Sequence, residues 1–125
     1  MIVDTSALIA IVREEPDADD FIDHLLTGSP IRMSAGTLIE ARMVAERDGG
    51  RRELDALVAQ VEIEIVPVDI RQVELASTGF QRFGKGRHKA GLNLGDLFAY
   101  ALARATGEPL LCKGNDFVYT DVEIA

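Results

Sequence analysis

The sequence contains very few of the residues that build disulfides, zinc sites or aromatic cores. Its 125 residues include one cysteine, Cys112, two histidines and no tryptophan, and 6% are aromatic. A single cysteine excludes an internal disulfide, and so few cysteine and histidine residues argue against a zinc site. Residues 1–4 lack the basic start of a signal peptide, and no apolar run approaches the ~20 residues of a membrane span. These absences predict a soluble, cytoplasmic protein with no membrane association.

The chain also contains few positively charged residues relative to its acids. Lys and Arg number 13 against 21 Asp and Glu, which gives a formal net charge of −8. This balance argues against a general nucleic-acid coat protein, because phosphate binding depends on cationic patches. It is compatible with a nuclease, since a site that holds Mg²⁺ is itself acidic, and it suits a basic protein partner.

Hydrophobic residues, at 47% of the chain, are abundant enough for the core of one domain covering residues 1–125. Short apolar runs alternate with amphipathic stretches. This alternation predicts an α/β fold with a short-stranded, mostly parallel central sheet and helices on both faces. The expected strands are 1–4, 31–33, 63–68, 110–112 and 122–124, and the expected helices are about 6–13, 16–27, 35–48, 54–61, 73–83 and 94–106.

Four acidic residues stand out by their places in this pattern. Asp4 ends the first predicted strand, and Asp116 closely follows the strand after the last helix. Asp96 lies in the first turn of that helix, and Glu40 lies inside an earlier one. In open parallel sheets ligands bind outside the carboxyl ends of the strands, so the acids at element ends face one crevice.

Convergence of these carboxylates has a physical cost that favours a metal ion. Two carboxylates ~5 Å apart repel by roughly 3 kcal/mol at an effective dielectric constant of about 20. Three or four together are stable only if a cation is present or a pKa rises. Mg²⁺ takes oxygen ligands, lowers the pKa of a bound water and stabilises charge on a phosphoryl group. Converging acids here therefore predict a divalent-metal site.

Each acid also has a structural interpretation. Asp4 fits the N-cap of the first helix, and Glu40 fits a solvated position in mid-helix. Asp96 follows Asn93 by three residues, the spacing of a capping box. Asp116 fits an ordinary turn. A capping role does not exclude a metal role, so these alternatives stay open.

The order and content of three segments resemble a known family. The segments are IVDTSALIAIV at the start, LIEARMVAE in the middle and GLNLGDLFAYALARATGEPLLCKGNDF near the end. They resemble the PIN-domain ribonucleases, and more narrowly the VapC toxins of bacterial toxin–antitoxin pairs. The resemblance implies a PIN-like three-layer α/β/α fold, a Mg²⁺ or Mn²⁺ site and endonucleolytic cleavage of RNA.

The same resemblance implies roles for particular residues. Asp4 and Asp96 are expected to be the principal metal ligands, and Glu40 to belong to the acidic cluster. A small hydroxyl residue near the first acid, Ser6 or Thr5, is expected to orient a ligand or a water molecule.

The fourth acid of the family usually lies in a stretch resembling T-x-D/N-x-x-F. Here residues 112–117 read CKGNDF, without the threonine and with compressed spacing. Asp116 is therefore the expected fourth acid, and Asn115 is the alternative for its place.

A basic, glycine-punctuated segment precedes the last helix. Arg82, Lys85, Arg87 and Lys89 are candidates to bind the RNA backbone. The alternative is a solvated loop that balances an acidic chain.

Partners also follow from the resemblance. A cognate VapB-type antitoxin is expected to lay an apolar helix into a groove of the early helices. VapC toxins usually dimerise, so a homodimer, or a heterotetramer or higher complex with the antitoxin, is expected.

Two other functions remain possible from the sequence. A phosphoacceptor receiver domain is also an α/β protein with an acidic Mg²⁺ pocket. It needs an acid pair after its first strand, where Asp4 stands alone, and Asp69 and Lys113 are its remaining candidates. A catalytically silent PIN scaffold is the other alternative.

Overall fold

The computed structural model describes residues 1–125 and contains one sheet of four parallel strands, in the order β3-β2-β1-β4. The strands are β1 (Ile2–Val3), β2 (Arg32–Ser34), β3 (Glu64–Val66) and β4 (Leu110–Leu111). The helices are α1 (Thr5–Val12), α2 (Ala18–Thr27), α3 (Ala35–Arg47), α4 (Arg51–Gln60), α5 (Ile70–Phe83), α6 (Leu94–Thr106) and the short 3₁₀ helix η1 (Phe117–Tyr119).

Strand β1 is a central strand with hydrophobic cores on both of its faces. Ile2 pairs with Arg32 of β2 and with Leu110 of β4. Because neighbouring side chains of a strand point to opposite faces, Val3 and Ile2 enter different cores. Val3 packs among residues of α1 to α4, and Ile2 among residues of α5 and α6. The predicted α/β fold with helices on both faces is confirmed.

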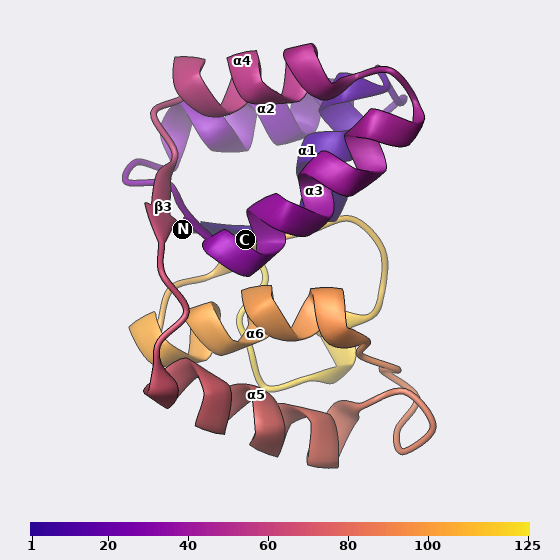
Figure 1. Cartoon of the computed structure of the whole chain (residues 1–125), viewed down its shortest axis with the longest axis vertical. Helices are drawn as coiled ribbons and strands as arrows, with labels where there is room; N and C mark the ends of the chain where they lie inside the picture. Colours follow the sequence, from indigo (N-terminus) through magenta and orange to yellow (C-terminus); the bar gives the residue numbers. More distant parts are fainter.

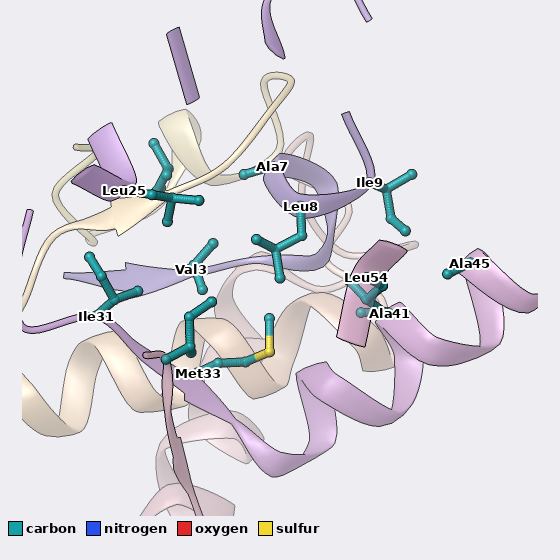
Figure 2. Close-up of a cluster of buried hydrophobic side chains, with 12 residues drawn as sticks. Val3, Ala7, Leu8, Ile9, Leu25, Ile31, Met33, Ala41, Ala45 and Leu54 are labelled. Atoms are coloured by element: carbon teal, nitrogen blue, oxygen red, sulfur yellow. The ribbon is translucent and has the colours of Figure 1, made fainter. Parts of the chain in front are cut away.

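Figure 2 shows the core on the Val3 face of the sheet. Leu8 of α1, Met33 of β2 and Leu54 of α4 belong to this cluster and are fully buried with Val3. Burying an aliphatic side chain of this size contributes about 1.5–3 kcal/mol. These contacts fix α1 against the sheet. They thereby also fix Asp4, which joins β1 to α1.

The helices gather in two groups. Figure 1 shows α1 to α4 in one half of the molecule and α5 and α6 in the other, with β3 crossing between them. In the second group α5 and α6 pack closely, and a β-carbon on Gly79 would lie 2.3 Å from the ring of Tyr100. None of the helices has the length and apolar content that crossing a membrane requires.

The expected elements appear in the expected order, with two corrections. Residues 122–124 form no strand, because only one isolated bridge joins Ile124 to Leu110 of β4. Leu26 and Leu94 lie on helical faces that their spacing predicts to be buried, yet they are 70% and 72% exposed. Periodicity finds the apolar face of a helix but not how much of that face its neighbours cover.

Candidate active site

Asp4 stands at the carboxyl end of β1, where it caps α1. Its Oδ2 atom accepts hydrogen bonds from the Ser6 amide at 3.0 Å and from the Ser6 hydroxyl at 2.6 Å. Its Oδ1 atom is buried and has no hydrogen-bond partner, and the residue is only 4% exposed. Burial raises the pKa of Asp4, the bonds from Ser6 oppose that rise, and the charge of Glu40 adds to it. The capping interpretation is therefore correct, and it occupies only one of the two oxygens.

Asp96, at the start of α6, likewise caps its helix and lines the same cavity as Asp4. Its Oδ2 atom accepts from the amide of Asn93 at 3.0 Å, and its own amide donates to Asn93 Oδ1 at 3.0 Å. This is the capping box that the sequence predicts. Burial, followed by the charges of Asp4, Asp116 and Glu40, raises the pKa of Asp96 to about 6 against the opposing bond from Asn93. The pKa of Asp96 therefore depends on the charges of all three other acids.

Glu40 reaches the start of α6 from α3. A β-carbon on Gly95 would lie 1.5 Å from Glu40 Oε2, so the carboxylate occupies space that only a glycine leaves open. Glu40 is half-buried and lines the same cavity as Asp4 and Asp96. Glu40 is therefore placed with the other acids rather than pointing away from them.

Asp116 lies beside this group but not inside it. It is exposed at the start of η1 and does not line the cavity of the other three acids, and its neighbour Asn115 is exposed as well. Its charge still acts on the cavity, because it contributes to the raised pKa of Asp96. Burial, followed by the charges of Asp4, Asp116 and Asp96, also raises the pKa of Cys112 to about 12. The Cys112 thiol is consequently neutral and is not a nucleophile.

The two hydroxyl residues after Asp4 differ in their contacts. Ser6 bonds Asp4 and also accepts the amide of Lys113 at 2.9 Å, which ties the loop after β4 to the start of α1. Thr5 is buried and donates to the carbonyl oxygen of Thr37 in α3 at 3.3 Å. Ser6 is therefore the hydroxyl that orients Asp4, and Thr5 is the one that holds α1 to α3.

The acids surround a cavity of about 340 Å³ between α1, α3, α6 and the loop after β4. Two cations also line it: Arg13, which the sequence did not single out, and Lys113, which was considered only for a receiver domain. Lys113 directly follows β4, whose carboxyl end faces the same crevice, so its position was a usable signal. Its ammonium group pairs with Glu15 and Asp17. The lining comprises Asp4, Thr5, Ser6, Ile9, Arg13, Glu15, Glu40, Val44, Asp96 and Lys113.

This donor set fits a hard divalent cation. The acidic donors of the cavity are carboxylate oxygens, and a buried carboxylate oxygen without a partner, such as Asp4 Oδ1, is costly unless a cation compensates it. No three His, Cys, Asp or Glu side chains are placed to hold one ion together. Mg²⁺ usually takes one or two carboxylate ligands and water for the remainder, so it does not require three acids at one point.

The basic segment before α6 lies outside this cavity. Three of its four cations are engaged with other side chains, and Lys85 is exposed. The contacts are Arg82 Nη1 to Asp121 Oδ2 at 3.0 Å, Arg87 over the Phe80 ring at 5.1 Å and Lys89 over the Tyr119 ring at 4.5 Å.

The residues that a receiver domain needs do not meet in this site. Asp69 caps α5 by accepting the amide of Gln72 at 2.9 Å, and it is not part of the acidic cavity. Lys113 is paired with Glu15 and Asp17 rather than with Asp69.

Comparisons with known proteins agree with this geometry. The PIN domain model matches residues 1–123. Ribonuclease VapC28 of Mycobacterium tuberculosis is 46% identical over all of this chain and 97% of its own length. Ribonuclease VapC of Mycolicibacterium smegmatis is 44% identical over 98% of this chain and 97% of its own length.

Two solved structures share the fold. A crystal structure of Mycobacterium tuberculosis VapC20, titled a Sarcin-Ricin loop cleaving toxin, has a TM-score of 0.75 at 19% identity, with 99% of this chain and 97% of that chain covered. A toxin–antitoxin complex from Klebsiella pneumoniae has a TM-score of 0.74 at 16% identity, with 99% of this chain and 95% of that chain covered. The match over residues 1–123 and the full-length relatives establish the conclusion: the chain belongs to the PIN-domain family and, within it, to the VapC ribonucleases.

Proposed function

We propose that this chain is a divalent-metal-dependent endoribonuclease and the toxin of a type II toxin–antitoxin pair. The observation that carries the chemistry is the buried, unpartnered Oδ1 atom of Asp4, in a cavity that Glu40 and Asp96 also line. Curated relatives named ribonucleases, at 40–46% identity, support RNA as the substrate. A cytoplasmic location accompanies that substrate.

Asp4 and Asp96 would hold the ion, Mg²⁺ or alternatively Mn²⁺. Each has one oxygen committed to a helix start and one left for a cation. When bound, the ion lowers the pKa of water and offsets charge on a phosphodiester. Glu40 and Asp116 add negative charge around that position, and Ser6 keeps Asp4 in orientation. Hydrolysis at this site would leave a 5′-phosphate and a 3′-hydroxyl.

The basic segment before α6 is a proposed RNA contact. Arg82, Lys85, Arg87 and Lys89 are exposed in or beside the loop that leads into the helix carrying Asp96. Contacts with aromatic rings and with Asp121 hold Arg82, Arg87 and Lys89 on this surface, where they can meet backbone phosphates outside the cavity.

A cognate VapB-type antitoxin is the proposed protein partner. A groove between α2 and α4 combines apolar side chains, among them Leu26 and Val61, with Glu62 and Glu64. An apolar floor with acidic neighbours suits an amphipathic helix that carries basic residues. The net charge of −8 favours the same partner.

A second copy of the chain is the proposed occupant of another face. The groove between α5 and α6 is lined by Val73, Phe80 and Leu94, all at least 38% exposed, and no acid lines it. In a strongly acidic chain, a face whose only charged lining residue is Arg87 is one where two copies meet with little repulsion. Homodimers would then combine with antitoxin into a heterotetramer or a higher complex.

One assay tests the central proposal. Purified protein is incubated with total RNA in Mg²⁺, in Mn²⁺ and in EDTA, and the product ends are mapped. We expect metal-dependent internal cuts with 5′-phosphate ends. Cutting that persists in EDTA, or no cutting with either metal, contradicts the proposal.

A further inference from the structure

An open hollow between α3 and α4 carries a concentration of positive charge that is unusual for this acidic chain. Three arginines line it, two from α3 and one from the start of α4, together with a single acid. Two exposed apolar side chains of α3 complete it. We call it the arginine hollow, and its lining is Ile39, Arg42, Met43, Glu46, Arg47 and Arg51.

One carboxylate behind the hollow holds two of the guanidinium groups in place. Arg42 Nε donates to Asp55 Oδ1 at 3.1 Å, and Arg51 Nε donates to Asp55 Oδ2 at 2.9 Å. Arg51 also donates through Nη1 to Glu46 at 3.1 Å. Because Arg42 meets Asp55 through Nε, its two Nη groups stay available to a second anion. A guanidinium that is already ordered loses less side-chain entropy when that anion binds.

The third arginine has no acidic partner. Arg47 is exposed and takes part in none of the ion pairs of the chain, although acids flank it in the sequence. Glu46 pairs with Arg51, and Asp48 pairs with Arg13. The charge of Arg47 is therefore uncompensated within the chain.

The arginine hollow adjoins the acidic cavity along α3. Glu40 and Arg47 are seven residues apart, which places them on one helical face about 10 Å apart along the axis. Val44, which lies between them, lines the acidic cavity. Arg13 lines that cavity as well and donates through Nε to Asp48, the C-cap of α3, at 2.6 Å. One RNA strand can therefore contact both places.

We propose that the arginine hollow binds backbone phosphates of the RNA strand whose cleaved bond lies in the acidic cavity. This inference rests on the proposed ribonuclease activity. Guanidinium groups present paired donors that match phosphate oxygens, and the charge-assisted bonds they form are strong. Ile39 and Met43 offer apolar contact to a sugar or a base between two phosphates. Two of the three arginines of the hollow lie on α3, the helix that carries Glu40, whereas the cations of residues 82–89 belong to the end of α5 and the loop before α6.

Salt-dependent RNA binding tests this inference separately from catalysis. The probe is a labelled single-stranded RNA of mixed sequence, in EDTA so that no cutting occurs, with anisotropy read over a series of KCl concentrations. Arg47→Gln should weaken binding several-fold and reduce the slope of log K against log[salt] by about 0.7, the value for one phosphate contact on a single strand. Arg47→Lys should retain the slope. Arg71→Gln is the matched control, because Arg71 is exposed on α5 and makes no ion pair.

Each other outcome has a defined meaning. Equal slopes for Arg47→Gln and Arg71→Gln overturn the arginine hollow as an RNA site, while metal-dependent cutting by the unmodified protein still supports the ribonuclease. Protein that neither binds nor cuts RNA overturns both. A change in oligomeric state of Arg47→Gln by light scattering, with RNA affinity unchanged, identifies the hollow as a protein contact and also overturns the inference.

Discussion

The carboxylate of Glu40 rests against the backbone of Gly95, with Oε2 only 1.5 Å from the place that a β-carbon would take. The contact places a carboxylate of α3 at the start of α6, the helix that carries Asp96. The relationship makes a glycine a determinant of site geometry, although it carries no chemical group of its own.

Gly95→Ala is predicted to reduce RNA cleavage about 10- to 100-fold, because a displacement near 1 Å at a reacting centre costs that much. The added methyl displaces the end of the Glu40 side chain, while alanine favours the helix by roughly 1 kcal/mol. Thermal melting should therefore show a folded protein. In a Glu40→Ala background the same change should have no further effect on rate, since coupled residues are non-additive. Additive losses would show that Gly95 acts in another way.

Asp4→Asn and Asp96→Asn are each predicted to lower cleavage by roughly 1000-fold while keeping the fold. Asparagine caps a helix as well as aspartate does, but it removes the charge that a cation needs. Asp69→Asn is the matched control, because Asp69 caps α5 with an equivalent bond at 2.9 Å outside the cavity. Activity that survives in both site variants is incompatible with the assignment.

Metal addition should give a second, independent measurement on the same variants. Mg²⁺ at 100 times its dissociation constant stabilises a protein that binds it by about 2.7 kcal/mol, and this appears as a rise in melting temperature. The unmodified protein and Asp69→Asn should show the rise, and the two site variants should not. Equal rises in melting temperature in all four proteins would show that the ion binds elsewhere.

Metal-free protein is predicted to lose stability as the pH rises from about 4 to about 6. The pKa of Asp96 is raised to about 6 in the fold, so the folded state holds a proton that the unfolded state has already released. Stability from this group is present below its unfolded pKa and is lost through the folded pKa. Urea titrations over this pH range should show the decline in the unmodified protein and a smaller one in Asp96→Asn. Mg²⁺ competes with the same proton, so its affinity should rise through about pH 6.

The basic segment before α6 makes its own prediction. If Arg87 and Lys89 bind RNA phosphates, the double change to glutamine should reduce the salt slope of binding by about 1.4, twice the single-contact value. The measurement uses the anisotropy assay described for the arginine hollow. An unchanged slope removes this segment from the RNA surface.

Local sequence patterns were sufficient to place two of the acids. Asp4 and Asp96 lie at helix starts, where capping chemistry involves residues only two or three positions away, so their positions follow from the chain itself. The parallel sheet was predictable for a similar reason, because alternation of short strands and helices admits few topologies.

The remaining features of the site depend on contacts between distant segments, which a sequence pattern does not contain. The place of Glu40 depends on Gly95 in another helix, and the arginine hollow depends on Asp55 reaching back to Arg42. Leu26 is exposed because no element of the chain covers its side of α2, which periodicity does not reveal. Asp116 was expected with the other acids, and the structure leaves it outside their cavity.

The two oxygens of Asp4 divide their tasks, since Oδ2 closes the start of α1 and Oδ1 is left without a partner. A substitution that removes the charge but keeps the shape should therefore disarm the protein without altering its surface. In a cell, such a disarmed copy would still be recognised by the neutralising partner proposed above. It would act as a decoy that draws this partner away and releases intact toxin, so a harmless variant would be toxic by competition.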